Sequence, residues 1–493
     1  MNSPLTPEGP SASADGVPCK TYQAGTLTYT AAGLVTLFFW LLWGDFCFVI
    51  MEKVWASIIP LKIKELQAPN WVIGAVMVSL PQILNLLLNP LISTASDRYR
   101  SSWGRRRPFM LIASPFIGIL LCVMGFFPEI GRGLYDLGLG RATGLSLSAI
   151  TIGVIGAVIA LFRIAELFIS TLFYYFFNDV VPREVIARFL ALARVVGLAG
   201  GALYEFFVFQ HALTHMRVIF VVAGLLYCVG FVMMCFRVKE GEYPPPSSRP
   251  VGDGSLARIR VYVKECLHQK LFVLLYLHTM VWTLASACAA FLVFMYLSLG
   301  LTLAQIGILA GITSVATGLL AYPAGMLADR FHPMRVMVWL KLGMVIWMPL
   351  NFVWLFTHFE PSVNFKILLS LNVISVIFWQ IYAATLMPLY MRLFPREQFG
   401  QFCSFLAICT ALVGVASGII GGLYIDRMRR IYPDMIYGQD FCYRLIPGWQ
   451  LFFASLGLIL LAMVYKEWKK RGGEACVFHG ESRPLSEDSK NDH

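Results

Sequence analysis

Long runs of apolar residues dominate this chain, and twelve of them are long enough to cross a membrane, which takes about 20 residues in a helix. Backbone groups find no water inside a bilayer, so these runs must form helices or a closed barrel. They lack the alternation of apolar and polar residues that is typical of barrel strands. We therefore expect an all-α integral membrane protein. The predicted helices cover 31–51, 71–95, 108–128, 146–177, 187–209, 217–236, 271–297, 304–327, 335–357, 366–391, 399–424 and 449–465.

A polar segment divides the twelve predicted helices into two sets of six. Residues 237–270 contain three consecutive prolines together with serine and glycine, a composition typical of linkers. We therefore expect a cytoplasmic linker over 237–270, between an N-terminal six-helix bundle over 31–236 and a C-terminal six-helix bundle over 271–465. Cytoplasmic tails are expected at 1–30 and 466–493.

The distribution of lysine and arginine predicts the orientation of the helices, because cytoplasmic loops carry an excess of both. With the N-terminus inside, the inside segments hold 25 of the 39 basic residues, the outside segments hold 11, and three lie within helices. This predicts a multi-pass protein of the plasma (inner) membrane with both termini cytoplasmic. The outside loop after Tyr424 is unusually basic, although Asp426, Asp434 and Asp440 partly offset its charge.

The composition excludes several classes of protein. Hydrophobic residues make up 58% of the chain and charged residues 14%, against about 25% charged residues in a soluble domain. A cytosolic enzyme and a nucleic-acid partner are therefore not expected, and basic cytoplasmic loops account for the net charge of +11. No nucleotide-binding or hydrolase motif is present, so we expect no cofactor. His211 and His215 lack a third ligand, so we expect no metal site.

Two short motifs occur at equivalent places in both halves. The sequence Ser-Asp-Arg-Tyr at 96–99 follows the second predicted helix, and Ala-Asp-Arg-Phe at 328–331 follows the eighth, 232 residues later. The sequence Pro-Arg-Glu at 182–184 recurs at 395–397, 213 residues later. Two matched motifs indicate a duplicated, pseudo-symmetric half.

The first of these loops continues as Trp-Gly-Arg-Arg-Arg-Pro over 103–108. Gly104 allows a tight turn, and Pro108 suits the first turn of the next helix. Six plus six helices, with Asp-Arg loops after the second and the eighth, resemble the major facilitator superfamily. The longer form of the first loop is similar to the glycoside–pentoside–hexuronide cation symporters and the related sucrose-transporter branch.

The resemblance implies a major facilitator fold, a function as a monomer, and alternating access, in which two halves rock about a central site. It also implies that the Asp-Arg loops gate the conformational change. The family pattern places a glycine four residues before the aspartate, where the first half has Ser93 instead. The gating residues carried over by position are Asp97, Arg98, Gly104, Arg105, Gly325, Asp329 and Arg330.

Charged residues within the predicted helices are candidates for proton or ion coupling, because each costs about 2.5–3.5 kcal/mol at a helix centre. Asp45 is the candidate proton acceptor, while Arg163 and Glu166 form an i,i+3 pair that would couple protonation to the solute. The alternatives are a buried aspartate bonded to a neighbouring helix and a structural ion pair. Glu52 is expected near the outer boundary, in contact with solvent.

Polar and aromatic residues that share a helix face are candidates for binding the solute, because sugars are bound by mixtures of polar groups and aromatic faces. The alternative for each face is helix–helix packing. The candidates are Gln82, Asn85 and Asn89 on the second helix, His278 and Trp282 on the seventh, and Trp379 and Tyr382 on the tenth.

Together these features predict a secondary active transporter, not an enzyme. It would carry a small polar solute, a sugar or glycoside, in symport with H+ or Na+, with membrane lipid around it. Two alternatives stay open. One is an antiporter that exports amphipathic compounds, and the other is a nutrient receptor that does not transport.

Overall fold

The computed structural model describes residues 21–99, 101, 103–241, 262–357, 359–395 and 398–475. Most of the predicted linker, most of both tails and residues 396–397 of the second Pro-Arg-Glu motif lie outside the described residues. The side chains of Asp97, Arg98 and Asp329 also lie outside them.

The described residues begin with a short hairpin and are helical for the most part thereafter. Strands β1 (Tyr22–Ala24) and β2 (Leu27–Tyr29) pair antiparallel, with Tyr22 opposite Tyr29. The helices up to the linker are α1 (Ala31–Glu65), α2 (Asn70–Gly74), η1 (Ala75–Ser79), α3 (Leu80–Arg98), α4 (Arg107–Gly125), α5 (Phe127–Leu134), η2 (Tyr135–Leu139), α6 (Gly140–Thr143), α7 (Leu147–Val180), α8 (Ile186–Leu203), η3 (Tyr204–Val208), η4 (Phe209–His211) and α9 (Met216–Arg237).

The part after the linker is also helical. Its elements are α11 (Lys270–Ala285), η5 (Ala287–Phe291), α12 (Leu292–Ser298), α13 (Leu303–Arg330), α14 (Pro333–Trp347), η6 (Met348–Phe352), α15 (Val353–Phe356), α16 (Pro361–Leu393), α17 (Phe399–Ile431), α18 (Asp434–Tyr437), η8 (Phe441–Leu445), α19 (Ile446–Lys470) and η9 (Gly473–Ala475).

Twelve helices among the described residues are long and apolar enough to span a membrane, which confirms the predicted fold class. The first of them differs from its predicted bounds, because α1 continues from the expected end at 51 to Glu65. The prediction stopped at the charged residues that begin with Glu52. The helix continues because Val54, Trp55 and Ile58 beyond that point are buried, so an apolar face extends past the charges.

The chain forms two compact units. The first unit comprises Met1–Trp55, Leu87–Tyr204 and His215–Ser248, and the second comprises Ala56–Leu86, Glu205–Thr214 and Arg249–His493. Two segments that precede the linker therefore pack with the residues that follow it. The division into bundles at 31–236 and 271–465 stays a prediction.

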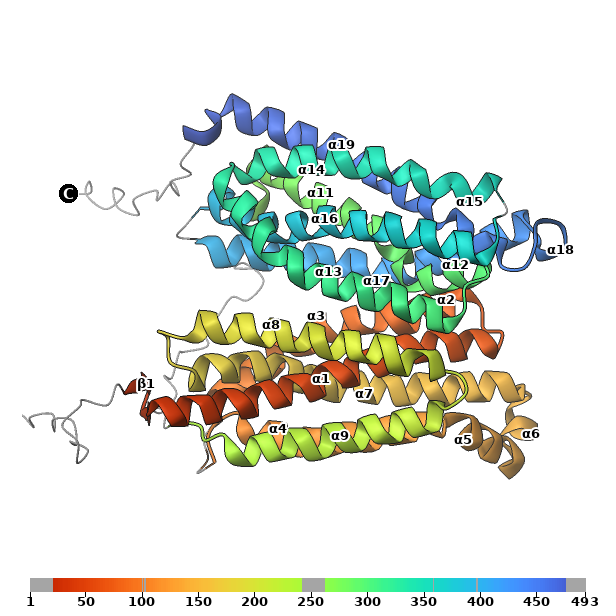
Figure 1. The fold of residues 1–493 in the computed structure, drawn as a ribbon, viewed down its shortest axis with the longest axis horizontal. Helices are drawn as coiled ribbons and strands as arrows, with labels where there is room; N and C mark the ends of the chain where they lie inside the picture. The colour runs from red at the N-terminus through yellow and green to blue at the C-terminus, as the bar shows by residue number, and fades with distance from the viewer. Residues whose placement is uncertain are drawn as a thin grey trace, which may run out of the picture. The chain divides into compact units, whose positions relative to one another are not determined.

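In the first unit, α4 packs lengthwise between α7 and α9 (Figure 1). The helices approach closely where glycines meet, since a methyl group on Gly118 would lie 2.9 Å from the carbonyl oxygen of Gly224. Phe173 continues the core, with its ring centroid 4.3 Å from that of Phe177 and 5.0 Å from that of Phe231. The hydrophobic effect does not drive helices together inside a bilayer, so close backbone contacts and the packing of rings hold these helices together.

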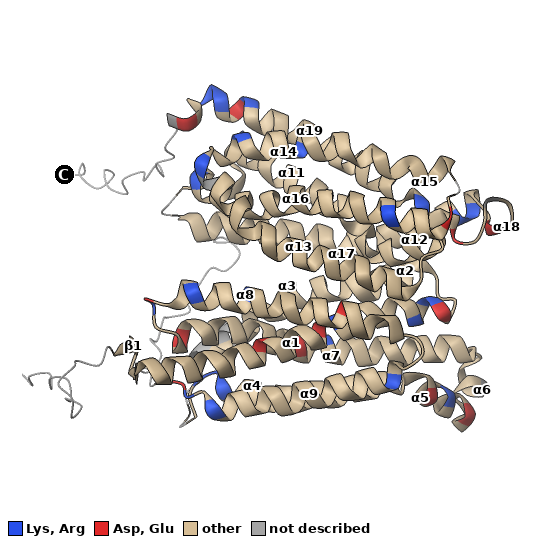
Figure 2. Ribbon diagram, in the orientation of Figure 1, with Lys and Arg blue, Asp and Glu red and all other residues tan. Residues whose placement is uncertain are grey.

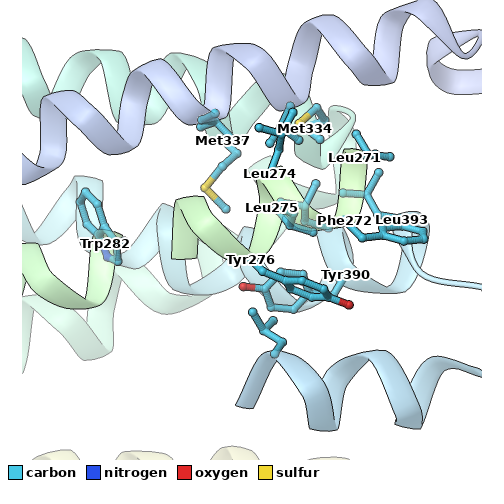
Figure 3. Packing of buried hydrophobic residues seen from close by; sticks show 14 of the residues in the cluster. Leu271, Phe272, Leu274, Leu275, Tyr276, Trp282, Met334, Met337, Tyr390 and Leu393 are labelled. Atoms are coloured by element: carbon cyan, nitrogen blue, oxygen red, sulfur yellow. The ribbon is translucent and has the colours of Figure 1, made fainter. Parts of the chain in front are cut away.

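In the second unit, α11 packs against α19, and α13 and α14 both pack against α16. The buried side chains of α11 and α14 meet in one apolar cluster, in which Leu274 and Leu275 lie near Met334 and Met337 (Figure 3). Tyr276 and Tyr390 extend the cluster toward α17. This packing leaves the next turns of α11 and α14, including Trp282, at the edge of a cavity described below.

Two of the spans contain a turn of π-helix, at Ala75–Ser79 and at Tyr204–Val208. Such turns are wider than α-helix and are frequent at functional sites. In the second unit, the end of α2 lies backbone to backbone with α17, because a methyl group on Gly74 would overlap the carbonyl oxygen of Gly418. The carbonyl oxygen of Glu205 meets Gly307 of α13 in the same way.

Candidate functional site

The first unit carries charged side chains within its spans, on α1 and α7 (Figure 2). Arg163 Nη1 lies 2.9 Å from Glu166 Oε2, and Glu166 is buried. The Arg163 guanidinium also lies 5.0 Å from the centroid of the Trp55 ring. The carboxylate is therefore balanced by an opposite charge that is itself held against an aromatic face.

Glu52 belongs to the same group of charges, because it interacts electrostatically with Arg163. The expectation that Glu52 lies in solvent at an outer boundary is wrong, because the residue is half-buried in the middle of the extended α1. The α7 pair is thus part of a group of charges that also includes Glu52 and Lys53, with two carboxylates and two cations.

Asp45 is half-buried on α1, seven residues or about 10 Å from Glu52 along the helix. It faces α8 at Gly197, where a methyl group would lie 3.6 Å from Asp45 Oδ2. It also interacts electrostatically with Tyr174 of α7. Asp45 therefore lies between helices of the first unit, and its role as proton acceptor stays a prediction.

The three polar residues of the second predicted span do not form one site. Asn89 Oδ1 accepts a hydrogen bond of 3.0 Å from Thr171 of α7 in the first unit. Gln82 lies in the second unit against Gly414 of α17, and Asn85 is exposed. The contact of Asn89 is the helix–helix packing that was the alternative for this face.

A cavity of about 590 Å³ lies within the second unit. Trp282 and Trp379, both predicted to bind solute, line it. Further polar and aromatic lining comes from Tyr296, Thr313, Trp347, Asn351, Asn372, Ser375 and Gln450. Cavities of this size commonly hold small ligands.

The other two predicted residues of this unit lie behind the wall. Tyr382 packs against both cavity tryptophans, with its ring centroid 5.6 Å from that of Trp282 and 5.5 Å from that of Trp379. His278 is buried, and its Nδ1 lies 2.8 Å from the carbonyl oxygen of Gly457 on α19. Tyr382 thus supports the aromatic wall, and His278 bonds one helix to another.

Lys341 of α14 is the charged residue of this region that sequence reasoning did not select. It is buried, with Nζ 2.6 Å from the centroid of the Trp282 ring and 3.9 Å from that of Tyr382. The signal was present in the sequence, because a lysine lies in the middle of the apolar run 335–357. The sequence analysis includes Lys341 among the three basic residues within helices and assigns it no role.

The first Asp-Arg loop is held by acids that sequence reasoning also missed. Gly104 has a positive φ of 101°, as the predicted tight turn requires. Arg105 donates three hydrogen bonds to the carboxylate of Asp179 at the end of α7, and the shortest is 2.8 Å. Glu240 Oε2 accepts from the backbone N–H groups of Arg106 and Arg107 and so caps α4.

Two of the residues predicted to gate from the second Asp-Arg loop are described, Gly325 and Arg330. Arg330 is exposed, and its guanidinium lies 5.7 Å from the centroid of the Phe331 ring. A methyl group on Gly325 would meet nothing within 4 Å, so this glycine is not at a close helix contact.

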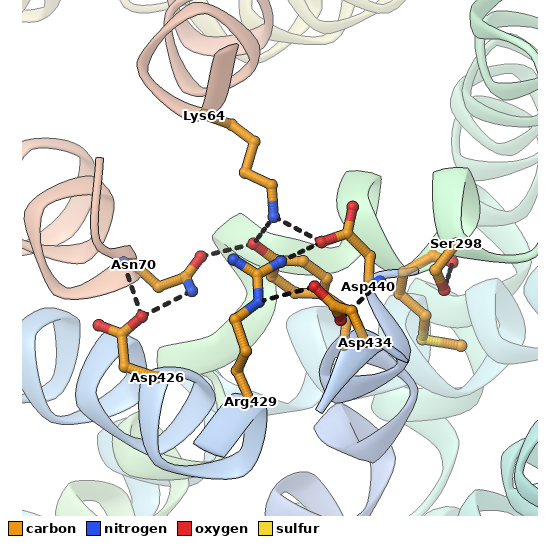
Figure 4. Close-up of polar contacts among 9 residues, drawn as sticks. Lys64, Asn70, Ser298, Asp426, Arg429, Asp434 and Asp440 are labelled. Atoms are coloured by element: carbon orange, nitrogen blue, oxygen red, sulfur yellow. Dashed lines mark hydrogen bonds and ion pairs between the residues drawn. The ribbon is translucent and has the colours of Figure 1, made fainter. Parts of the chain in front are cut away.

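A polar cluster in the second unit joins the end of α1 and the start of α2 to α17 and the segment before α19 (Figure 4). Lys64 Nζ lies 2.8 Å from Asp440 Oδ1 and donates to Tyr443 Oη at 2.6 Å. Asp426 accepts from the backbone N–H groups of Asn70 and Trp71 and thereby caps α2. The tyrosine hydroxyl also donates to Asn70 Oδ1.

This cluster contains one of the arginines that make the segment after Tyr424 unusually basic. Helix α17 continues to Ile431, so Arg429 lies in its last turn. Arg429 pairs with both Asp440 and Asp434, the latter at 3.5 Å. The prediction that nearby aspartates offset this positive charge is confirmed for Arg429.

The sequence matches one protein family and is similar to several known proteins. The family described as MFS/sugar transport protein matches residues 63–426, which is more than half of the chain. Human solute carrier family 45 member 4 is 26% identical over 263 residues, which are 50% of this chain and 32% of that relative. The Arabidopsis thaliana sucrose transport protein SUC3 is 41% identical over 54 residues, 11% of this chain and 9% of that protein. The chain thus spans less than two thirds of either relative.

A solved structure shares the fold. The nucleoside transporter NupG superposes with a TM-score of 0.62 over 86% of this chain and 99% of its own, at 14% identity. Its sequence is too distant to say more than that the helices are arranged alike. With the family match over 63–426 and twelve candidate spans, this multi-pass membrane protein belongs to the sugar-transport family of the major facilitator superfamily.

Proposed function

We propose that the chain carries a sugar or glycoside across the membrane in symport with a proton or another cation. The observation that carries the proposal is the cavity of the second unit. Its wall combines the rings of Trp282 and Trp379 with neutral amide and hydroxyl groups, and none of the described residues that line it is charged. Sugars have apolar C–H faces and many hydroxyl groups, so this wall matches both parts of their surface.

The relatives support the same class of solute. The segment similar to SUC3 belongs to a protein named for sucrose transport. The family match is to sugar transporters as a group and leaves the individual sugar open. A cavity of about 590 Å³ fits a solute of modest size.

Coupling to a cation is supported by the carboxylates of the first unit. Glu166 is buried beside Arg163, and ionisable groups within spans are rare unless they serve transport or pair with one another. Protonation of Glu166 would remove the negative charge that holds Arg163. The freed guanidinium would then seek another acceptor, which links proton uptake to a rearrangement of the first unit. Asp45 would receive the proton from the aqueous side.

The remaining parts of the proposal concern conformation and placement. Alternating access would be gated by the loops at 97–105 and 325–330, and the Arg105–Asp179 bonds would stabilise one of the two states. We place both termini in the cytoplasm and the protein in the plasma membrane, functioning as a monomer. The excess of lysine and arginine on the predicted inside supports this orientation.

The test measures proton movement in proteoliposomes that contain the full chain, with a pH-sensitive dye outside. Mono- and disaccharides are added without an imposed gradient. Symport predicts alkalinisation outside with one of the sugars, and loss of this signal in Asp45→Asn and Glu166→Gln, which keep shape but cannot ionise. Glu65→Gln is the matched control, because Glu65 is exposed and bonds only to Lys62 among the described residues.

Each result separates the proposal from its alternatives. Proton-coupled uptake by Asp45→Asn at the wild-type level contradicts the role of Asp45. A sugar signal that depends on sodium instead of protons identifies the other cation. Binding of a sugar without uptake favours a receptor, and release of amphipathic dyes with no response to sugars favours an exporter.

A further inference from the structure

A further cavity opens on the surface of the first unit, between α4 and α9. It is an apolar groove of about 340 Å³. Its floor is the close contact of Gly118 with Gly224, which are both buried and have no side chain to fill the surface above them. Ile119 of α4 and Leu225 of α9 also line the groove, and they are 60% and 57% exposed. The groove is therefore open along its length, on two helices that are candidate membrane spans.

The length of the groove matches one leaflet of a bilayer. Its lining on the α4 side runs from Pro115 to Phe126, which is about 16 Å at 1.5 Å per residue. The hydrocarbon core of a bilayer is about 30 Å thick, so one leaflet contributes about 15 Å. Because α4 ends at Gly125, the groove begins at the end of the span and reaches about its middle. One acyl chain of a lipid in that leaflet would run along it.

An acyl chain is the occupant that suits the lining of the groove. Apolar side chains, glycines and two cysteines form this lining, and none of its described residues is charged. An empty groove would leave these residues without van der Waals contacts on one side. Neighbouring acyl chains are all as apolar as the lining, so the chain alone does not select one kind of lipid. Selection therefore depends on the groups at the end of the groove.

Two opposite charges lie at the end of the groove that is nearest to α5. Arg217 of α9 pairs with Glu129 of α5, and their side chains are 58% and 44% exposed. The Arg217 guanidinium lies 5.9 Å from the centroid of the Phe126 ring, which lines the groove. Ile130, which follows Glu129 in the chain, lines the groove as well. The pair therefore lies where the head group of a lipid in the groove would be.

The two charges complement a zwitterionic head group. The phosphate of such a lipid would accept hydrogen bonds from the Arg217 guanidinium, and charge-assisted bonds of this kind are about twice as strong as neutral ones. Its ammonium would meet the Glu129 carboxylate. The exchange costs little, because an ion pair between exposed side chains contributes little to stability. A lipid with a phosphate and no cation would satisfy only Arg217 and would place its negative charge near Glu129.

We propose that the groove between α4 and α9 is a binding site for one zwitterionic phospholipid. An acyl chain lies along the glycine floor, the phosphate contacts Arg217, and the ammonium contacts Glu129. The lipid then joins α5 to α9 in place of the direct ion pair between these two residues. The site lies wholly within the first unit, so it is separate from the cavity of the second unit and does not depend on which solute is carried.

The test is native mass spectrometry of the full chain, purified in detergent and titrated with three probes that share 1-palmitoyl-2-oleoyl chains. Phosphatidylcholine carries both charges, phosphatidylglycerol carries only the negative charge, and the diacylglycerol carries none. We expect one phosphatidylcholine per chain, bound at least about tenfold more tightly than the diacylglycerol, which corresponds to about 1.4 kcal/mol. Phosphatidylglycerol should bind with an affinity between the two.

Variants of the two charged residues test the head-group contacts. Arg217→Gln should abolish the preference for phosphatidylcholine over the diacylglycerol, and Glu129→Gln should abolish its preference over phosphatidylglycerol. Arg132→Gln is the matched control, because Arg132 is exposed on α5 and does not line the groove. Both preferences should survive in this control.

Two further variants fill the groove itself. Val123→Phe and Cys228→Phe place a ring in the space of the acyl chain, so each should weaken the binding of all three probes at least about tenfold. Ile112→Phe adds the same ring to α4 outside the groove, at a residue that is 75% exposed, and should leave binding unchanged. Size-exclusion chromatography checks that each variant is folded, and the exposed head-group variants decide the matter if a filled groove does not fold.

Three results overturn the proposal. The first is equal binding of phosphatidylcholine and the diacylglycerol by the wild type. The second is tighter binding of phosphatidylglycerol than of phosphatidylcholine. The third is binding that is unchanged in both folded variants with a filled groove. All three leave the proposed sugar transport standing, because the solute cavity belongs to the other unit.

Discussion

The two units use charge in opposite ways inside the membrane-spanning helices. In the first unit, Arg163 and Glu166 neutralise each other at 2.9 Å, and Glu52 lies within reach of the same guanidinium. In the second unit, Lys341 lies between aromatic rings without an acid among its described neighbours. The carboxylate of Glu166 faces an opposite charge, whereas Nζ of Lys341 has no hydrogen-bond partner among the described residues.

This difference separates two tasks that a coupled transporter must perform. An internal ion pair responds to a proton, because protonation of one partner changes the charge of the other's surroundings. An uncharged wall of aromatic rings, amides and hydroxyl groups, as in the cavity of the second unit, suits a polar solute. In the proposed function, ion coupling therefore belongs to the first unit and recognition of the solute to the second.

The largest expected effect comes from removing one charge from each unit. Arg163→Met leaves Glu166 buried without its partner, and breaking a buried pair in this way lowers stability by about 3–5 kcal/mol. Lys341→Met removes a charge that has no partner to strand, so its stability should equal or exceed that of the wild type. Thermal unfolding of both variants in detergent, followed by size-exclusion chromatography, measures the contrast. Equal destabilisation by both substitutions would contradict the comparison.

The second unit should depend more on backbone packing than on charge. Gly418→Ala places a methyl group against the backbone of Gly74 and the hydroxyl of Ser79, and overpacking of this kind costs about 1–3 kcal/mol. Gly325→Ala is the matched control in the same unit, because a methyl group there meets nothing within 4 Å. The melting temperatures of the two variants should therefore differ. If the control melts as early as Gly418→Ala, the close contact is not the cause.

A smaller effect is expected from the aromatic wall of the cavity. Trp379→Ala removes a ring that lines the cavity and packs on Tyr382, so the affinity for the solute should fall about tenfold. The number of protons moved per solute should stay unchanged, because the carboxylates lie in the first unit. A changed ratio in proteoliposomes would show that the two tasks are not separate.

The smallest expected effect concerns a histidine outside the spans of the second unit. His332 Nδ1 accepts a hydrogen bond of 3.2 Å from the backbone N–H of Met334 and caps α14. Burial, and then the charge of Arg392, lower the pKa of His332 below its usual value. The unfolded chain therefore binds the proton more readily, so the contribution of this cap is present above about pH 6.5 and is lost as the pH falls below it.

A substitution isolates this pH dependence. His332→Asn keeps a capping oxygen without a titrating group, so melting temperatures between pH 5 and 8 should vary less in the variant than in the wild type. The difference amounts to less than about 1 kcal/mol. A variant whose pH profile matches that of the wild type would exclude His332 as its source.

The sequence predicted the twelve spans because each depends on a local property, the length of an apolar run. It selected Trp282 and Trp379 as candidates, and both line the cavity, whereas His278 and Tyr382 on the same helix faces do not. It did not find Asp179 or Glu240, because each meets the arginines of the first loop only through the fold, more than 70 residues away. For the same reason the sequence did not predict that the polar residues of α3 have different neighbours. Asn89 contacts Thr171 of α7, whereas Gln82 contacts Gly414 of α17.

Because of the π-helical turn at Ala75–Ser79, the number of residues in this turn determines which way the side chains of α3 point. A π-turn accommodates one more residue than the α-helix around it, so deletion of a single residue there could restore regular α-helix. The remainder of α3 would then be rotated by about 100° about its axis, and Asn89 would turn away from Thr171. A one-residue deletion at this turn is therefore expected to cost Thr171 its hydrogen bond to Asn89.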